Sequence, residues 1–200
     1  MTIALIEDDE AVLDSLRLLL ESRGMTVRCF NSAEVFLDSI GKEPPDCIVS
    51  DVRMPGLSGL DLQRTLRAQG RRLPVILITG HGDIAMAVTA MREGAFDFLE
   101  KPYDAEQLIA SIERALAAEQ KLRSLEGERH ALAGRIAELS PRQKQVMDLV
   151  AQGLSNKQIA ARLGISPRTV ENYRAWVMER MGAANIAELV RKVLLVQGAG

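Results

Sequence analysis

The sequence predicts two domains, an α/β domain built on a parallel sheet and a smaller domain made of helices alone. Residues 1–103 alternate five short apolar runs with amphipathic segments, and a fifth amphipathic segment follows from residue 104, which is typical of a doubly wound parallel sheet. Residues 140–200 contain only helical patterns, each opened by a capping residue. The length of 200 residues suits two small domains better than one average domain.

Charge divides the chain in the same place. Residues 1–120 carry 12 Lys and Arg against 20 Asp and Glu, a net charge of −8, whereas residues 121–200 carry 13 against 7, a net charge of +6. The basic half is therefore a candidate for binding nucleic acid. No apolar run reaches the roughly 20 residues of a membrane span, and the first residues lack a basic n-region. We expect a cytoplasmic protein with no signal peptide and no membrane contact, in which Cys29 and Cys47 are buried reduced thiols.

Five apolar runs are predicted to form the strands of the sheet, and these are Ile3–Ile6, Met25–Phe30, Cys47–Ser50, Val75–Ile78 and Phe96–Leu99. The first helix is predicted from Glu10 to Arg23, because its apolar residues follow helical spacing and Gly24 ends it. Capping residues open the four helices that follow, and these are Ser32, Ser58 with Asp61, Asp83, and Asp104 with Gln107.

Four of the five predicted strands are followed by polar side chains at their C-terminal ends. The groups are Glu7, Asp8 and Asp9 after the first strand, Asp51 after the third, Thr79 with Gly80 after the fourth, and Lys101 with Pro102 after the fifth. A parallel sheet gathers these strand ends at one edge, so groups that are distant in sequence become neighbours.

This set of side chains suits phosphoryl transfer, with Asp51 as the acceptor. Clustered carboxylates need a cation, and oxygen ligands beside a phosphate favour Mg²⁺, with Mn²⁺ as a substitute. A lysine can pair with a phosphoryl oxygen as a point charge, and a threonine hydroxyl can donate to another. No separate base is required, because phosphoryl transfer depends mostly on positioning and charge neutralisation.

The order of these residues resembles that of a response-regulator receiver domain. The resemblance rests on E-D-D at residues 7–9, D-V-R-M-P-G-L-S-G at residues 51–59, T-G at residues 79–80 and K-P at residues 101–102, and it covers residues 1–120. It implies a flavodoxin-like sheet of order 2-1-3-4-5. It also implies that a histidine kinase phosphorylates Asp51, that Glu7 and Asp8 form an acidic pocket, and that Mg²⁺ binds Asp8, Asp51 and the backbone carbonyl of Arg53.

Further roles follow from the same resemblance. Asp9 extends the acidic run and is a possible metal ligand in place of a neighbour. Thr79 and Phe98 correspond to the family's switch pair, and the residues that contact or respond to the phosphoryl group are Thr79, Gly80, Phe98 and Lys101. For Phe98, plain core packing is the alternative. The bond between Lys101 and Pro102 is expected to be cis. The stretch T-G-H-G-D at residues 79–83 is similar in particular to the FixJ branch of the family.

Residues 104–139 are rich in strong helix formers and carry two mostly apolar series with a seven-residue repeat, which is broken by polar residues at Ser111 and Arg129. One series is Leu108, Ala115, Leu122, Arg129 and Ile136, and the other is Ser111, Ala118, Leu125, Leu132 and Leu139. Either the fifth helix is extended and forms a dimeric coiled coil, or it is a helical linker that packs this stripe on its own domains. Gly127 and Gly134 weaken the helix and leave both alternatives open.

Residues 140–200 follow the plan of a helix-turn-helix domain. Capping boxes at Ser140–Gln143 and Ser155–Gln158 open two helices, and Gly164 ends the second after a short run. Ser166 and Pro167 then open a longer helix, and Asn185 opens the last one. In this plan the helix after the tight turn enters the major groove of DNA by its N-terminal residues.

This segment also strongly resembles the LuxR-type output domain of NarL/FixJ regulators, through L-S-P-R-Q-K-Q-V and G-L-S-N-K-Q-I-A-A-R-L-G-I-S-P-R-T-V-E-N-Y-R. The resemblance implies a recognition helix at residues 167–181. We expect the bases to be faced by Arg168, Glu171, Asn172 and Ala175. We expect the phosphates to be contacted by Asn156, Lys157, Thr169 and Arg174. We expect Trp176 to belong to the core, and the outer part of the last helix to be where the family dimerises on DNA.

The combined expectation is a two-component transcription factor that is phosphorylated at Asp51, dimerises and binds promoter DNA. The implied partners are a histidine kinase, double-stranded DNA, a second copy of the chain and RNA polymerase. Release of an inhibited output domain is an alternative to dimerisation.

Three competing functions are disfavoured. A phosphatase with Asp51 as nucleophile fits less well, because the prominent class of these enzymes has a second Asp where this chain has Arg53. We therefore expect no enzyme activity beyond slow self-dephosphorylation. The complete set of acidic, threonine and lysine residues argues against a constitutive DNA binder. A small-molecule sensor is disfavoured because residues 1–103 are accounted for as a receiver.

Overall fold

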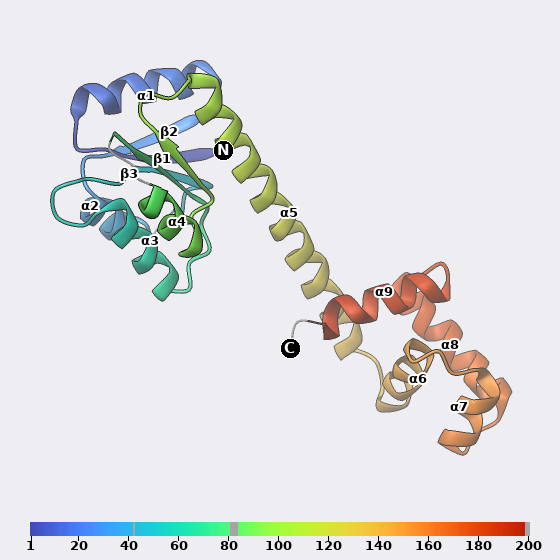
Figure 1. Cartoon of the computed structure of the whole chain (residues 1–200). Coiled ribbons are helices and arrows are strands. Elements are labelled where there is room, and N and C mark those ends of the chain that lie inside the picture. The colour runs from blue at the N-terminus through green and yellow to red at the C-terminus, as the bar shows by residue number, and fades with distance from the viewer. Residues whose placement is uncertain (42, 81–83, 199–200) are drawn as a thin grey trace. The chain divides into compact units, whose positions relative to one another are not determined.

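The computed structural model describes residues 1–41, 43–80 and 84–198, and it divides the chain into two compact units, Met1–Lys121 and Leu122–Gly200. Figure 1 shows the sheet with its covering helices in the first unit and helices alone in the second. The predicted fold class, an α/β domain followed by an all-α domain, is confirmed. The helix predicted to open at Asp83 is present, but Asp83 itself lies outside the described residues.

The first unit contains a five-stranded parallel sheet of order β2-β1-β3-β4-β5, as the resemblance implies. The strands are β1 (Thr2–Ile6), β2 (Thr26–Phe30), β3 (Cys47–Asp51), β4 (Val75–Thr79) and β5 (Asp97–Glu100). In the register of the central strands, Ile6 pairs with Ser50 and Asp51 pairs with Ile78. This register brings the C-terminal ends of β1, β3 and β4 to the same edge of the sheet.

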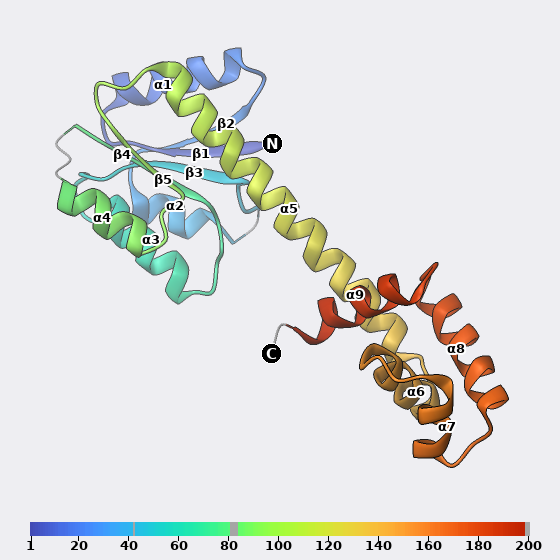
Figure 2. The ribbon, with the colours of Figure 1, turned by 45° about the vertical axis from the view of Figure 1, so that its right-hand side comes forward.

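Helices cover both faces of this sheet, and each face has its own hydrophobic core. Helix α1 (Glu10–Ser22) and the first turns of α5 (Ala105–Ala137) pack on one face with Ile3, Leu5 and Ile76. Helices α2 (Ala33–Ser39), α3 (Gly59–Ala68) and α4 (Ile84–Arg92) pack on the other. Figure 2 shows α1 and α5 on the side of the sheet opposite to α2, α3 and α4. The middle strands β3 and β4 are buried throughout because helices cover both of their faces.

Local capping signals define where several helices begin. The Asp9 carboxylate accepts hydrogen bonds from the backbone N–H groups of Ala11 and Val12 at the start of α1. The predicted capping box of Ser58 and Asp61 is present at the start of α3. Each of these side chains satisfies backbone donors that a helix leaves unpaired in its first turn.

Helix α5 (Ala105–Ala137) is one continuous helix of 33 residues. The two ends of its apolar stripe are buried, with Leu108 and Ala115 in the first unit and Leu132 in the second. Between them, every residue from 121 to 131 is exposed, including Leu122 and Leu125. The ends of the stripe therefore pack as the linker alternative predicts, and the coiled coil stays a prediction for the exposed middle.

The polar break at Ser111 in this stripe has a structural reason. Ser111 is fully buried, and its hydroxyl donates a 2.6 Å hydrogen bond to Oδ2 of Asp97 on β5. Arg114 donates to the same carboxylate oxygen at 2.6 Å. A leucine at position 111 would leave this carboxylate with one donor fewer, so the serine serves the contact between α5 and β5.

The second unit packs four helices around one core, which also takes in Leu132 and Leu139. The helices are α6 (Pro141–Ala151), α7 (Asn156–Leu163), α8 (Pro167–Met181) and α9 (Ile186–Gln197). Both predicted capping boxes, at Ser140 and Ser155, are present. Gly164 ends α7 at φ +65°, a left-handed conformation that L side chains rarely adopt, which makes the tight turn before α8 possible.

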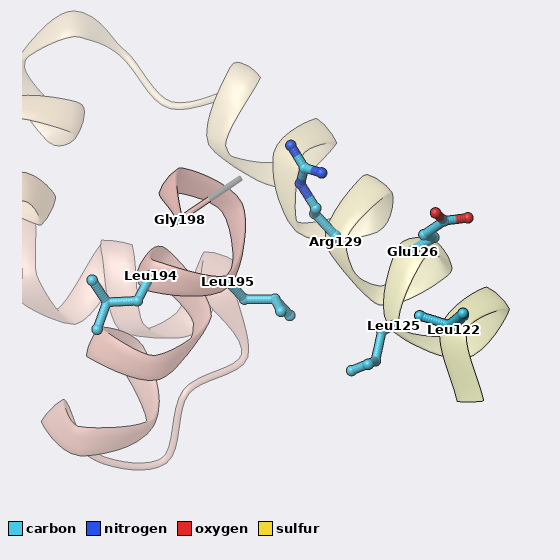
Figure 3. Close-up of a pocket in the computed structure, with 7 residues that line it drawn as sticks. All are labelled: Leu122, Leu125, Glu126, Arg129, Leu194, Leu195 and Gly198. Carbon is cyan, nitrogen blue, oxygen red and sulfur yellow. The ribbon is translucent and has the colours of Figure 1, made fainter. Parts of the chain in front are cut away.

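A shallow hollow of about 280 Å³ lies in the second unit between α5 and α9. Figure 3 shows Leu125 of α5 and Leu195 of α9 pointing toward it from opposite sides. Most of the lining residues are leucines. Leu122 and Leu125 of the α5 stripe therefore lie near apolar residues of α9 but stay exposed to solvent.

Two expectations about burial were wrong. Cys29 is exposed, because β2 is an edge strand of the sheet, whereas Cys47 on the inner strand β3 is buried as expected. Trp176 is not in the core, and 62% of its surface is exposed. It lies on α8 away from the stripe of Val170, Val177 and Met181 that the helix buries.

Across the described residues, none of the helices combines the length and the apolar character needed to cross a membrane. The long helix α5 is the only one that approaches such a length among them, and it carries charged residues throughout.

Candidate functional site

Three polar side chains are buried where strands β1, β3 and β4 end. Glu7 follows β1 and is 5% exposed, Asp51 ends β3 and is 7% exposed, and Thr79 ends β4 with no exposed surface. Buried carboxylates are rare unless they are paired. Two of them at one edge of the sheet therefore mark this edge as the candidate site.

Lys101, which follows β5, pairs with both carboxylates. Its ammonium group donates hydrogen bonds to Oε2 of Glu7 at 2.9 Å and to Oδ1 of Asp51 at 3.0 Å. Its backbone N–H donates to the carbonyl oxygen of Thr79 at 2.7 Å. The structure thus brings together Glu7, Asp51, Thr79 and Lys101, four residues that are separated by up to 94 positions in the sequence.

The environment shifts the pKa values of Glu7 and Lys101 upward. Burial raises the pKa of Glu7, the hydrogen bond from Lys101 opposes this effect, and the nearby Asp51 carboxylate adds to it. Burial lowers the pKa of Lys101, but the hydrogen bonds to Glu7 and Asp51 outweigh burial, and the pKa is raised. The site therefore keeps a firmly charged ammonium between two carboxylates, one of which binds a proton more readily than an ordinary glutamate.

The second oxygen of Asp51 is held by the loop that follows. The backbone N–H of Arg53 donates a 2.6 Å hydrogen bond to Oδ2 of Asp51, and the Arg53 residue as a whole is exposed. Both carboxylate oxygens thus accept a hydrogen bond, Oδ1 from Lys101 and Oδ2 from Arg53. The carboxylate is fixed in orientation before any substrate arrives.

The other two acidic residues of the E-D-D run lie apart from this pair. Asp8 is exposed, and the Asp9 carboxylate is occupied as the cap of α1. In the described ranges, no three acidic, histidine or cysteine side chains converge as a metal cluster. Oxygen donors nevertheless fit Mg²⁺, because this ion usually binds one or two protein carboxylates and keeps several waters. Asp8, Asp51 and the Arg53 carbonyl are such donors, whereas the Asp9 carboxylate caps α1.

The loop after Asp51 is held by a residue that the sequence patterns did not single out. The Glu34 carboxylate of α2 accepts a hydrogen bond from the backbone N–H of Leu57 at 2.8 Å. This bond lowers the pKa of Glu34. Gly56 has φ +79°, and a Cβ there would lie 2.3 Å from Oε1 of Glu34. Because Glu34 and Leu57 are 23 residues apart, no local spacing could have indicated this contact.

Gly59 allows the start of α3 to approach the acceptor strand. A Cβ at Gly59 would lie 2.4 Å from the carbonyl oxygen of Asp51 and 3.1 Å from Oγ of Ser50. The N–H of Gly59 donates to the carbonyl of Val52 at 3.1 Å. Gly59 is therefore required for close packing beside Asp51.

The remaining residues of the predicted receiver site lie around this centre. Phe98 is half-buried and pairs in register with Leu77 of β4. Alternation along β4 places Leu77 and Thr79 on one face of the sheet, so Phe98 shares that face with Thr79. Gly80 is exposed directly after β4, and the bond between Lys101 and Pro102 is cis.

The second unit presents a separate candidate surface along α8. Arg168, Glu171, Asn172 and Ala175, the four residues expected to face the bases, are all exposed. Val170, Val177 and Met181 on the other side of the helix are buried. The helix thus turns one face to the core and offers the opposite face, starting at its N-terminus, to a partner.

The residues expected to contact phosphates lie on two helices. Lys157 is exposed in the first turn of α7, and Thr169 is partly buried in the first turn of α8. The guanidinium of Arg174 donates a 2.6 Å hydrogen bond to Oδ1 of Asn156 at the start of α7. This contact brings Asn156 and Arg174 together and leaves Lys157 as the exposed cation of the group.

Comparison with known proteins adds to this geometry. A model of the response regulator receiver domain matches residues 3–113, and a model of the luxR family of bacterial regulatory proteins matches residues 137–193. The transcriptional regulatory protein FixJ of Azorhizobium caulinodans is 49% identical over 195 residues, which are 98% of this chain and 92% of that protein. FixJ of Bradyrhizobium diazoefficiens is 48% identical over 189 residues, which are 94% and 92% of the two chains.

Two solved structures are similar over nearly the full length. The response regulator StyR, 39% identical, has a TM-score of 0.80 and is matched over 96% of this chain and 97% of its own. Full-length FixJ from B. japonicum, 45% identical, has a TM-score of 0.62 over 100% and 98% of the two chains.

Proposed function

This chain belongs to the two-component response regulators with a receiver domain and a LuxR-type output domain, in the FixJ-like branch, and we propose that Asp51 is its phosphoacceptor. One observation carries the proposal. Asp51 is the buried carboxylate whose Oδ1 pairs with Lys101 and whose Oδ2 accepts from the loop backbone. In the proposed reaction the donor is a phosphohistidine of a histidine kinase.

The proposed transfer needs no base on this chain. A carboxylate oxygen of Asp51 forms the new bond to phosphorus, the P–N bond of the phosphohistidine breaks, and its electron pair stays on the imidazole nitrogen. The product is an acyl phosphate on Asp51. Lys101 balances the charge that is added, because its ammonium already lies within hydrogen-bond distance of the acceptor.

Mg²⁺ is the proposed cofactor, with Mn²⁺ as a substitute, as is general for the receiver family. The residues that would hold it are Asp8, Asp51 and the carbonyl of Arg53, with Glu7 acting from the pocket wall. When bound, the ion neutralises phosphoryl charge during transfer. This chain's own contribution is to hold Asp51 in place and to keep its surroundings largely free of water, since Glu7 and Thr79 are buried beside it.

In the proposed switch, Thr79 responds to the phosphoryl group and Phe98 relays the change. The new group adds about −1.5 to −2 charge at pH 7, which is enough to bias a two-state element. Thr79 lies at the end of β4 on the face that Phe98 shares. A hydrogen bond from the Thr79 hydroxyl to the phosphoryl oxygen would free space for Phe98 to turn inward, next to Gly80 and α4.

A homodimer is the proposed active form. Helix α4 offers three large apolar side chains to solvent, since Ile84 is 84% exposed, Val88 is 42% exposed and Met91 is 48% exposed. An apolar surface next to a switching strand supports a contact that forms when the strand changes. The dimer presents two output domains to a two-fold DNA site.

The proposed DNA contacts divide into two sets. Asn172 and Glu171 can read adenine and cytosine edges, beside Arg168 and Ala175. The contacts to phosphates come from Lys157, and from Thr169 with the linked pair of Asn156 and Arg174. In this proposal the bound dimer engages RNA polymerase at a promoter in the cytoplasm and activates transcription.

In this account Asp51 is an acceptor and not the nucleophile of a turnover enzyme. Arg53 stands where the prominent class of aspartyl phosphatases has its general acid, so hydrolysis of the acyl phosphate is expected to be slow.

The test is phosphorylation of the full chain by a small phosphodonor with Mg²⁺, followed by mass spectrometry of the intact protein and its peptides. We expect one phosphoryl group, located on Asp51, and none on Asp51→Asn. Asp14→Asn is the matched control, because Asp14 is an exposed aspartate on α1, and it should be labelled like the wild type. Equal labelling of Asp51→Asn and wild type would overturn the proposal.

A further inference from the structure

Trp176 occupies a place on α8 that neither the core nor an internal contact accounts for. It is 62% exposed, although tryptophan is usually largely buried in proteins. In the part of the chain that the structure describes, its indole has no hydrogen-bond partner and no ring neighbour. Since the chain has a single tryptophan, this side chain is both unusual and easy to observe.

The helical spacing places Trp176 beside residues of the proposed DNA surface. Thr169, Asn172 and Trp176 follow one another at intervals of three and four residues, so they form one stripe along α8. This stripe lies away from Val170 and Val177, which the helix buries. Trp176 therefore continues the DNA-facing surface toward the C-terminal half of the helix.

The position along the helix decides which part of DNA the indole meets. Trp176 lies nine residues after Pro167, the first residue of α8, which corresponds to about 13.5 Å along the helix axis. The major groove is about 12 Å wide. When the N-terminal turn of α8 enters the groove, a side chain at this distance reaches the wall of the groove and not the base edges.

Arg180, which lies four residues after Trp176 on the same side of α8, is already paired, because its guanidinium forms an ion pair with the carboxylate of Glu138. An indole can contact the sugar-phosphate wall of the groove without a positive charge, because its apolar body packs on deoxyribose while its N–H donates to a phosphate oxygen.

We infer that Trp176 is a further DNA-contact residue, which packs against the sugar-phosphate wall of the major groove and fixes how α8 lies in it. The inference rests on the proposed DNA binding by α8. Contacts to the backbone position a protein but carry no sequence information directly. Trp176 therefore contributes affinity equally on all duplexes, whereas Asn172 and Arg168 contribute to the choice of sequence.

The first test uses wild-type full-length protein, so it does not depend on the folding of any variant. Tryptophan fluorescence is recorded with a phosphodonor and two duplexes of equal length, one selected by the protein from a random pool and one scrambled. We expect quenching by iodide or acrylamide to fall severalfold when either duplex is bound. An indole that stays as accessible in both complexes as in free protein overturns the inference.

The second test measures affinity. Trp176→Ala is expected to weaken binding to both duplexes by the same factor of about tenfold, the loss of a hydrogen bond to a charged group. The slope of affinity against salt should stay unchanged because the indole has no charge, whereas Lys157→Ala should reduce the slope by about one. Trp176→Phe keeps the apolar body without the N–H group, so its affinity for both duplexes should lie between that of Trp176→Ala and that of wild type.

Leu18→Ala is the matched control, since Leu18 is 61% exposed and lies on α1 of the other unit. It should bind both duplexes like the wild type. Unchanged binding by Trp176→Ala, or a loss confined to the selected duplex, contradicts the wall contact. Shielding of the indole only after RNA polymerase is added would identify a protein contact instead and overturn the inference. A wild-type protein that binds neither duplex would overturn the proposed function itself.

Discussion

The ammonium group of Lys101 lies 3.0 Å from Oδ1 of Asp51 and 2.9 Å from Oε2 of Glu7. One cation thus balances two carboxylates that are each more than nine-tenths buried. The proposed phosphoryl group and metal ion enter a site whose charges already depend on one another, so the contribution of each residue can be measured by removing it.

Replacing Lys101 by Met should destabilise the receiver unit in buffer without Mg²⁺. Both carboxylates would stay buried without a cation, and the free energy of unfolding should fall by about 3 kcal/mol. Lys101→Arg keeps the positive charge, so its free energy of unfolding should fall much less. Urea unfolding followed by circular dichroism measures the difference. A Lys101→Met variant as stable as wild type would show that the ammonium does not offset the two charges.

The raised pKa of Glu7 predicts a stability difference that depends on pH. Because its folded-state pKa lies above the ordinary value of 4.5, its contribution to stability is complete below that value and is lost as pH rises through the folded-state pKa. Glu7→Gln cannot titrate and avoids this loss. In metal-free buffer, the stability of the variant relative to wild type should therefore increase between about pH 4 and pH 7. If the stabilities of the two proteins changed with pH in parallel, the result would contradict the raised pKa of Glu7.

Gly59 and Gly127 should respond in opposite ways to alanine. A Cβ at Gly59 would lie 2.4 Å from the Asp51 carbonyl oxygen, so Gly59→Ala should lower the free energy of unfolding of the receiver unit by about 1–3 kcal/mol. A Cβ at Gly127 of α5 meets nothing within 4 Å, and Gly127→Ala should stabilise this helix by up to about 1 kcal/mol. Denaturation curves and helix content test both changes. A harmless Gly59→Ala would mean that the start of α3 can move away from Asp51.

The two cysteines should differ in reactivity toward a thiol reagent. Cys47 is fully buried, and burial raises the pKa of its thiol to about 12. Cys29 is exposed on the edge strand, although partial burial also raises the pKa of its thiol. One thiol per chain should react in native protein and two in denaturant, and Cys29→Ser should abolish the native reaction. Reaction of both thiols in native protein would show that the core around β3 opens readily.

Local signals in the sequence were sufficient to predict most of the fold. The capping boxes at Ser58, Ser140 and Ser155 each involve residues three positions apart, and the apolar runs of β3 and β4 are buried on both faces. The order of the strands followed from the resemblance to the receiver family.

Contacts between distant residues could not be predicted in this way. The bond from Leu57 to Glu34 joins two segments whose proximity is a result of the fold. Cys29 looked buried by its apolar neighbours, but its exposure depends on the place of β2 at the edge of the sheet. The exposure of Trp176 could have been found, because its helical phase differs from that of Val170 and Val177. Its size and hydrophobicity favoured the core instead.

The central claim is that phosphorylation of Asp51 controls DNA binding by α8. The most direct measurement is the affinity of the full chain for a duplex recovered from its own genomic binding sites, titrated with and without a small phosphodonor and Mg²⁺. We expect the phosphodonor to increase the affinity of wild type and of Asp14→Asn, and to leave Asp51→Asn at the level of unphosphorylated protein. An Asp51→Asn variant whose affinity rises with the phosphodonor as much as that of wild type would contradict the claim.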